Sequence, residues 1–394
     1  MSHILYVYEK MMPTVAITME SELFSGTTVE TRFVRVLDIS ASDIDWADSF
    51  VFIRPTNILS YLVAKKAKKL GCFVNVFCDD DLLHLPSTLC DVPWRREALR
   101  KCLSICDIIT SSSPYIAENY AKLSQSHRHL FSNTIISKTD YEKIPEISKE
   151  TDHVSIVYAA GKDHSGLFSE YIEPIIPRLA EKYGKRLSLA FVGVEVESKE
   201  FDHLLNVEHY PGMPLQQYRQ FMRKKHFDIG ISPLHIDSFS KCKYFNKYLE
   251  YTMVGTVGIY TRTEPYTYII NDGENGFLSD NTPESWYDSL CRAIDDKTLR
   301  DSCFETAREQ LQTVFNLENN RQQVFSQIPE FLVSRDHKIK CGSLWFSKSI
   351  YCFFRLFDIV YISLWNFKKG GIKQMIKKWK NSISFRNMFI EKGV

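Results

Sequence analysis

The chain has few features of a secreted, metal-binding or membrane-spanning protein. Its 394 residues include ten cysteines, but no pair has CxxC or zinc-finger spacing. We therefore expect reduced, buried thiols, as in a cytosolic protein. No run reaches the roughly 18 uncharged apolar residues that a spanning helix needs. The start, MSHILYVYEKMMPTV, has charges inside a strand-like pattern, so we predict no signal peptide.

An excess of charge of one sign is also absent from the chain as a whole. Its 49 Lys and Arg nearly balance 48 Asp and Glu, which leaves a net charge of +1. We expect no nucleic-acid partner. The charge is unevenly distributed, because twelve Lys or Arg but only two acids, Asp358 and Glu391, follow from residue 338 onward. A strongly basic C-terminal region is thus joined to a mildly acidic remainder.

Two stretches alternate apolar runs with helical patterns. In the first, HILYVY, SFVFI, CFVNVF and ICDIITSS are typical of buried parallel strands, and SYLVAKKAKKLG of a helix that ends at Gly71. The second begins at HVSIVYAAG, includes a long helix over about 168–183, and continues through SLAFVGV, FDIGISPL, TVGIYT and GFLS. A polar segment over about 133–152 links them. We predict an α/β protein with doubly wound sheets in domains 1–150 and 151–335.

The remaining range, 336–394, has a different character. SLWFSKSIYCFFRLFDIVYISLWNF is dense in aromatic residues, and KKGGIKQMIKKWKNS follows as a basic amphipathic pattern. Trp and Phe beside Lys-rich faces are typical of a helix that lies in a membrane interface. We therefore expect contact with a membrane surface through 340–381. The alternative is that the aromatic part packs on the N-terminal domain.

Residues 241–278 carry the most informative pattern in the chain. Lys243, Lys247 and Glu250 are spaced at i, i+4 and i+7, which predicts that they share one helix face. Gly255 is a helix-ending residue, and the TVGIY that follows is β-rich. Free N–H groups at the start of such a helix, with its lysines, favour binding of an anion such as phosphate.

This order of residues resembles the donor-binding segment of the GT-B glycosyltransferases, specifically the group 1 family (family 4). The matching residues are Lys243, Asn246, Lys247, Leu249, Glu250, Tyr251, Gly255, Val257, Asp272, Gly273, Gly276 and Leu278. The resemblance is strongest over about 225–290 and weak on the N-terminal side. It implies two Rossmann-like domains that face a central cleft, with the acceptor on the first and a nucleotide diphosphate sugar on the second.

Two features depart from the family pattern. The family often has two glutamates in this segment, and the first would fall at Cys242 here, with Asp237 the nearest acid. Many members also have a Gly-Gly loop after the first strand, whereas this chain has YEKMMP. The identity of the acceptor therefore does not carry over.

The resemblance also implies roles for individual residues. Glu250 would accept hydrogen bonds from the ribose hydroxyls, because a carboxylate offers two acceptor oxygens. Lys162 and Lys243 would neutralise the diphosphate leaving group without a metal. The full candidate donor set is Gly161, Lys162, His164, Lys241, Lys243, Asn246, Lys247, Glu250, Glu264 and Tyr266. We expect no cofactor besides the nucleotide sugar, which is the substrate.

Three consecutive acids in CDDDLLHLP end an apolar strand, so we expect them at the carboxyl edge of the first sheet. Asp80 and Asp81 are candidates to bind acceptor hydroxyls or to act as general base, and close carboxylates raise at least one pKa. Arg54 also follows a strand and is a further candidate to line the cleft. Two alternatives remain open: a solvated helix N-cap, and a metal-binding DxD motif of the GT-A type, which needs a single mixed sheet.

These expectations combine into one functional hypothesis. The chain would be a retaining glycosyltransferase that acts on a saccharide or lipid-linked acceptor in O-antigen, lipopolysaccharide or capsule assembly. We expect it in the cytoplasm, peripheral on the inner face of the cytoplasmic membrane. The alternatives are a nucleotide-sugar epimerase of the same fold, and a non-catalytic protein that binds sugar nucleotides or glycans.

Overall fold

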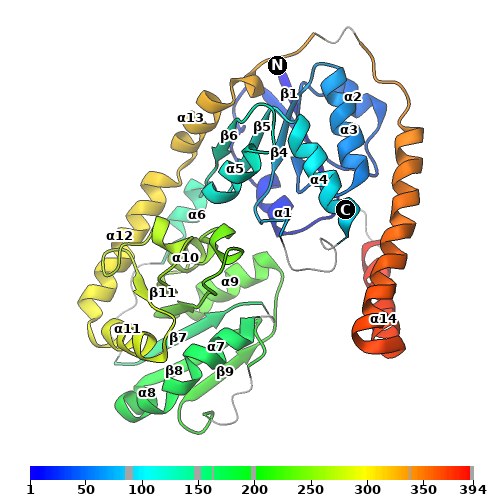
Figure 1. Cartoon of the computed structure of the whole chain (residues 1–394). Helices are drawn as coiled ribbons and strands as arrows, with labels where there is room; N and C mark the ends of the chain where they lie inside the picture. Colours follow the sequence, from blue (N-terminus) through cyan, green and yellow to red (C-terminus); the bar gives the residue numbers. More distant parts are fainter. Residues whose placement is uncertain (85–91, 146–151, 162–163, 197–200, 337–338, 391–394) are drawn as a thin grey trace.

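The chain forms two α/β domains followed by a long C-terminal helix (Figure 1). The computed structural model describes residues 1–84, 92–145, 152–161, 164–196, 201–336 and 339–390. Each domain is built on a six-stranded sheet whose paired strands all run parallel. This confirms the predicted pair of doubly wound sheets. It also excludes the single mixed sheet that the GT-A alternative requires.

The first sheet has the strand order β2-β1-β3-β4-β5-β6. Its strands are β1 (Ser2–Tyr8), β2 (Val29–Arg35), β3 (Ser49–Ile53), β4 (Phe73–Phe77), β5 (Ile108–Ser111) and β6 (His129–Phe131). The connecting helices are α1 (Pro13–Met19), α2 (Ala41–Trp46), α3 (Ile58–Lys69), α4 (Pro93–Ile105) and α5 (Pro114–Ala121). Only the step from β1 to β2 runs in the opposite direction, so right-handed crossovers put α1 on one face and α2–α5 on the other.

The buried side chains of the first domain fall into two clusters that match these faces. One cluster joins Phe50, Phe52 and Val76 of the strands to α3, α4 and α5. The second joins alternate strand residues such as Tyr6 and Val51 to α1. Among the described elements of the first domain, this second face therefore carries one short helix.

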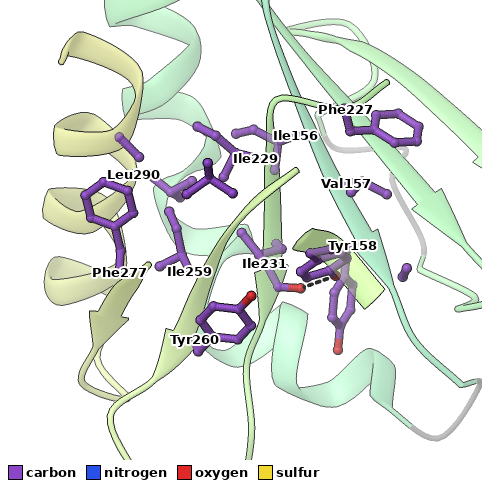
Figure 2. Packing of buried hydrophobic residues seen from close by; sticks show 14 of the residues in the cluster. Ile156, Val157, Tyr158, Phe227, Ile229, Ile231, Ile259, Tyr260, Phe277 and Leu290 are labelled. Carbon is purple, nitrogen blue, oxygen red and sulfur yellow. Dashed lines mark hydrogen bonds between the residues drawn. The ribbon is translucent and has the colours of Figure 1, made fainter. Parts of the chain in front are cut away.

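The second sheet has the order β12-β11-β10-β7-β8-β9. Its strands are β7 (Val154–Ala159), β8 (Leu187–Val192), β9 (Asn206–Tyr210), β10 (Ile229–Ser232), β11 (Val257–Thr261) and β12 (Phe277–Ser279). Its helices are α7 (Ser165–Tyr171), η2 (Glu173–Ile175), α8 (Ile176–Tyr183), η3 (Gly184–Arg186), α9 (Leu215–Lys225), η4 (Ser240–Cys242), α10 (Asn246–Thr252), η5 (Tyr266–Tyr268), α11 (Pro283–Asp295) and α12 (Lys297–Val314). Figure 2 shows Ile229, Ile231 and Ile259 of its central strands packed together, with Leu290 of α11 alongside. Burial on both faces is expected for a parallel sheet covered by helices.

Two predictions about local structure differ from the observed fold. The single helix over about 168–183 is α7, η2 and α8 instead, because Pro174 and Pro177 interrupt it. Within the described part of the predicted linker over 133–152, the chain forms α6 (Lys138–Glu142), and Ile136 and Ile144 pack into the second domain.

The chain crosses back to the first domain before it reaches the predicted boundary at 335. Helices α13 (Leu317–Gln327) and η6 (Pro329–Leu332) lie against the first sheet, with Val324, Ile328 and Phe331 in its second buried cluster. Ser2 donates a hydrogen bond to the carbonyl of Phe331 at 2.6 Å. The division at 151–335 thus assigns to the second domain a segment that packs on the first.

Helix α14 (Trp345–Ile390) covers the outer side of the first domain (Figure 1). It is two helices, because Gly370 and Gly371 have non-helical backbone angles. The first part packs on α3, and its Tyr351, Asp358 and Asn366 are buried. The predicted packing of this part on the N-terminal domain is therefore present.

Candidate functional site

One cleft of about 1210 Å³ is lined by both domains. On the second domain it is formed by residues that follow β7 and β10, two neighbouring strands whose connections leave in opposite directions. Ligands of doubly wound sheets bind at such a switch point, at the carboxyl ends of the strands. On the first domain the residues after β4 line the same cleft. The predicted central cleft is thus present.

The wall beside β7 requires two loops to lie very close together. A Cβ on Gly193, after β8, would be 2.9 Å from the carbonyl oxygen of Ala160, and Gly193 has φ +78°. Gly161 and His164 line the cleft next to this contact. The hydroxyl of Tyr158 donates to the carbonyl of His164 at 2.8 Å, which fixes the loop before α7. Lys162, a predicted diphosphate ligand, lies outside the described residues.

Lys247 and Glu250 form the central ion pair of the second domain. Their Nζ and Oε2 atoms are 2.5 Å apart, and both side chains are about one quarter exposed to the cleft (25% and 24%). The hydroxyl of Tyr218, from α9, is 3.4 Å from each. Burial alone would lower the pKa of Lys247, but the charge of Glu250 outweighs it and raises the pKa. Lys247 therefore stays protonated, with its ammonium group held beside Glu250 at the cleft surface.

Lys243 reaches the same cleft from a different position than predicted. Helix α10 begins at Asn246, so Lys243 precedes it in extended backbone (φ −71°, ψ 162°) and does not share a helix face with Lys247 and Glu250. The residue before the helix, Phe245, is buried against Phe315, and this contact fixes where the helix starts. Lys243 and Asn246 both line the cleft.

Two carboxylates, Asp79 and Asp80, form the opposite wall, and Arg54 holds them from outside the cleft lining. Arg54 pairs with Asp79 at 3.3 Å and with Asp80 at 2.8 Å, from a backbone with φ +50°. Thr14 donates a hydrogen bond to Asp79. Burial and the charge of Asp79 raise the pKa of Asp80, while Arg54 and Lys243 act in the lowering direction. Lys243 of the second domain and Asp80 of the first thus act on each other across the cleft.

Asp81 points away from the cleft into a contact between the domains. It accepts a hydrogen bond from Tyr120 at 2.9 Å and is 2.8 Å from Nδ1 of His84. The thiol of Cys242 lies 3.9 Å from its carboxylate, and burial followed by the charge of Asp81 raises the pKa of Cys242 to about 12. Cys242, where the family pattern has a glutamate, is therefore packed in the core of the first domain.

Some of the predicted site residues do not line the cleft. Tyr266 lines it, with its hydroxyl 2.6 Å from that of Ser232. Among the described residues, the cleft lining does not include Arg54, Asp81, Lys241 or Glu264. Asp81 is used by the interdomain contact. Lys241 lies in η4, which docks on α5, and Glu264 precedes the turn that carries Tyr266.

The cleft residues that the sequence analysis missed include Tyr218 and Arg219, which lie beside Lys247 and Glu250 in the donor wall. Both lie on α9, whose sequence LQQYRQFMRKK is typical of a solvated surface helix. Arg219 is 3.7 Å from Glu20 of the first domain, and its Nε has no hydrogen-bond partner in the described structure. No local signal predicts either residue, since their partners are distant in sequence. Among the described residues, no group of three or more His, Cys, Asp or Glu side chains is arranged to hold a metal ion.

Comparisons with known proteins agree with this architecture. No protein-family model matches the sequence, and no curated protein matches it. Among solved structures, HepE from Anabaena, in complex with UDP and glucose, matches with a TM-score of 0.59 and 11% identity over 84% of this chain and 100% of that chain. A glycosyltransferase from Rickettsia africae matches with a TM-score of 0.59 and 12% identity, over 85% and 99%. Sucrose-phosphate synthase from Thermosynechococcus elongatus matches with 0.58 and 12%, over 84% and 99%. The chain therefore has the GT-B fold.

Proposed function

We propose that the chain is a glycosyltransferase that moves a sugar from a nucleotide diphosphate sugar to a saccharide or lipid-linked acceptor. One observation carries the proposal: Lys243, Lys247 and Glu250 of one domain face Asp80 of the other across a single cleft. Transfer between two bound molecules needs such a paired site, because holding both reactants together removes much of the entropic barrier. The similarity to the structure of HepE in complex with UDP and glucose supports a nucleotide sugar as the donor.

The donor would use the polar groups of the second domain. Glu250 accepts hydrogen bonds from the two ribose hydroxyls, and Lys247 and Tyr218 keep its carboxylate oriented. Lys243 and Arg219 contact the diphosphate. The buried Nε–H of Arg219 has no hydrogen-bond acceptor in the described structure, and the guanidinium is 3.7 Å from the carboxylate of Glu20. Cations at this point stabilise the charge that develops as the diphosphate leaves.

The acceptor would lie against the first domain. Asp80, oriented by Arg54, accepts a hydrogen bond from the attacking hydroxyl. In agreement with the family 4 resemblance, we propose retention of the anomeric configuration, for which no dedicated general base is required. An NMR assignment of the product's anomeric proton tests this step. An inverted product would instead make Asp80 the general base.

Release of nucleotide from a panel of UDP, GDP, dTDP and CMP sugars tests the main proposal. We expect one donor class to be turned over, and Glu250→Ala to lower its turnover by about 100-fold through loss of charged hydrogen bonds. Glu181→Ala, an exposed glutamate of the same domain, is the matched control and should match the parent. No turnover with any donor, together with equal nucleotide binding in both variants, would contradict the proposal.

We also propose that α14 holds the protein on the inner surface of the cytoplasmic membrane, where it takes part in cell-surface polysaccharide assembly. The side chains of α14 are not arranged as in a core helix, which directs its apolar face into the protein. Of its described positions, Tyr351, Asp358 and Asn366 are buried, and two of these are polar, whereas many of its large apolar side chains point outward, with Trp345 74%, Phe346 69% and Leu364 63% exposed. Trp345–Lys368 is long and apolar enough to cross a membrane by length and composition, and 17% of its most apolar window is buried.

The polar side of α14 favours a helix that lies on the bilayer over one that crosses it. Asp358 pairs with the buried Arg95 at 2.8 Å and accepts from Trp94 at 2.7 Å. A spanning helix would have to leave the domain and break this buried pair, at a cost of roughly 3–5 kcal/mol. A helix in the interface keeps the pair and buries its outer face in lipid. The basic residues that follow fit an anionic surface.

Co-sedimentation with vesicles containing anionic lipid tests this attachment. A variant with Phe346→Ser, Phe353→Ser and Leu364→Ser removes apolar area only from the outward face, since each is more than half exposed. We expect its vesicle-bound fraction to fall by about tenfold, because each side chain contributes more than 1 kcal/mol of burial. The control Ile236→Ser, an exposed residue of the second domain, should bind as the parent does. Equal binding of all three proteins would contradict the proposal.

A further inference from the structure

The cleft extends well beyond the donor groups, along the second face of the first sheet. Residues from all six strands line this extension, and most are apolar or aromatic: Tyr6, Phe33, Val51, Ile53, Phe77 and Leu130. They lie on one face because side chains alternate along each strand. The strand register confirms it, pairing Tyr6 with Phe33 and with Val51 in one row, and Ile53 with Phe77 in the next.

The space exists because the sheet is incompletely covered on this side. A six-stranded sheet is roughly 24 Å wide at 4.8 Å per strand. Of the described elements of its own domain, the seven-residue helix α1 alone lies on this face, with α13 and η6 returning from the second domain. The loop between α1 and β2 closes the groove instead. Its Phe24 packs on Phe325 and Phe331, with ring centroids 5.9 Å apart in each case.

The closing loop is held from both domains. Arg321 of α13 donates to the carbonyls of Glu22 and Leu23 at 3.0 and 2.8 Å. On the opposite side Glu20 contacts Arg219, the residue next to Tyr218 in the donor wall. The groove is therefore continuous with the cleft, and the loop that covers it is held in place by these contacts.

One end of the groove is polar and the other is not. Asp79 and Asp80 lie at the carboxyl edge of the sheet, beside Lys243. Further back along the strands the lining is apolar apart from a few groups such as Asn75 and Thr110, which hydrogen-bond to each other at 3.0 Å. An acceptor whose reacting hydroxyl lies at Asp80 would thus extend its other end over apolar side chains.

From this arrangement we infer that the groove binds an apolar aglycone of the acceptor, an alkyl or aryl group next to the sugar that reacts. The inference rests on the proposed glycosyl transfer and names the acceptor class for it. Two side-chain rows about 7 Å apart along the strands have room for an aryl ring or a chain of about six to eight carbons.

Helix α14 packs on α3, on the opposite face of the sheet, so the groove does not open toward the face that we assign to the membrane. Its occupant is therefore a short group and not a bilayer-anchored chain.

Binding of octyl and methyl glycosides to the full-length protein tests the inference. Glycosides of glucose, galactose, mannose and N-acetylglucosamine are titrated by calorimetry in the presence of UDP, below the micelle threshold. We expect the best octyl glycoside to bind at least about tenfold more tightly than its methyl counterpart, since each buried methylene adds several-fold. Equal affinity for the two would overturn the inference.

Substitutions locate the binding site within the protein. Val51→Phe fills the groove, and Val360→Phe makes the same change on the exposed surface of α14. We expect the octyl preference to disappear in the first and to persist in the second; the reverse would assign the octyl chain to α14 and overturn the inference. Phe33→Ala, on the edge strand β2, removes one wall without overpacking and should reduce the preference if Val51→Phe fails to fold.

Nucleotide binding separates this inference from the proposed function. UDP affinity depends on the second domain and should be unchanged in Val51→Phe and Phe33→Ala. If UDP binds and sugar is transferred but octyl and methyl acceptors perform alike in all variants, the groove assignment fails alone. If none of the nucleotides in the donor panel binds the parent protein, the proposed function fails first.

Discussion

Asp80 has a charge environment set by both domains. Burial and the neighbouring Asp79 raise the pKa of its carboxyl, and Arg54 and Lys243 lower it, with a net rise. Lys243 belongs to the second domain, so its position relative to the first affects the proton on Asp80. The carboxylate that we propose to hold the acceptor is thus tuned by the lysine that we propose to hold the diphosphate.

Replacing Lys243 should move the acidic limb of the pH–rate profile. Lys243→Met removes a cation that favours the carboxylate, so the pKa of Asp80 rises further and kcat/KM begins to fall at a higher pH. We expect the midpoint of this limb to shift by about one half to one pH unit. The shift is read from the midpoint pH and does not depend on how much the variant's rate falls. Lys241→Met changes a nearby lysine outside the cleft lining and should leave the limb in place. An unmoved limb in both variants would show that Asp80 does not titrate in this reaction.

At the scale of single residues, local spacing predicted some groups in the cleft but not the contacts between them. Lys247 and Glu250 are close in sequence, and their ion pair follows from helix geometry. Tyr218 is 32 residues before Glu250, and nothing in its own helix marks it. The buried position of Asp81 depends on Tyr120 and Cys242, which only the tertiary fold brings together.

Among the elements, α14 is attached to its domain by a chain of buried charges. Arg95, near the start of α4, lies between Glu9 at 3.0 Å and Asp358 at 2.8 Å, and all three side chains are largely buried. Burial opposes ionisation of Asp358, but hydrogen bonds from Arg95, Trp94 and Arg355 outweigh it and hold its pKa below the usual range. The pKa of Glu9 is lowered in the same way by Arg95. The helix is thus held by these buried charges in addition to the packing of Tyr351 in the core and of Phe357 and Tyr361 on Trp94.

Asp358→Asn should therefore destabilise the protein far more than a matched surface change. We expect a loss of roughly 3 kcal/mol in the free energy of unfolding, at the low end for a broken buried pair because Glu9 still partners Arg95. Asp38→Asn breaks the exposed pair with Arg35 in the same domain, whose side chains are 49% and 58% exposed, and should cost under about 0.5 kcal/mol. Urea unfolding followed by circular dichroism measures both. Similar losses in the two variants would contradict the role of the buried pair.

The pair also predicts how stability depends on pH. A carboxyl with a lowered folded pKa contributes stability that is fully present above its unfolded pKa of about 4 and is lost as pH falls through the folded value. The parent should therefore lose stability below about pH 4 more steeply than Asp358→Asn, which has one such carboxyl fewer. Parallel curves of unfolding free energy against pH would refute this.

Where the hydrophobic pattern was regular, the sequence predicted correctly whether a segment is a strand or a helix. The buried strands HILYVY and SFVFI are β1 and β3, because continuous apolar runs suit a sheet covered on both faces. The strand β2, VETRFVR, was missed because its exposed edge position gives it a mixed pattern. For α14, periodicity gives the two faces of the helix but not which one meets the domain, so the sequence predicted membrane contact and left packing on the first domain as an alternative.

At the scale of the whole molecule, the two sheets and the cleft between them could be predicted, whereas the path of the chain between domains could not. Alternating strands and helices determine a doubly wound sheet through short right-handed connections. The return of α13 and η6 to the first sheet depends on Val324, Ile328 and Phe331 fitting an uncovered face 200 or more residues earlier in the chain. No local pattern reports such a contact. The same uncovered face provides the groove.

The two-domain arrangement predicts that donor binding and transfer can be lost separately. Asp80→Asn changes only the first domain, so we expect its UDP affinity to stay within about twofold of the parent, while sugar transfer falls by about 100-fold through loss of the charged hydrogen bond to the attacking hydroxyl. Glu250→Gln keeps the shape of the side chain but loses the carboxylate that Lys247 orients, so UDP affinity should fall by about tenfold and transfer should fall with it. Calorimetry with UDP and a coupled turnover assay, run on both variants, measure the two quantities independently. If Asp80→Asn weakened UDP binding as much as Glu250→Gln does, the nucleotide would be bound by both walls of the cleft, and the division of roles between the domains would have to be abandoned.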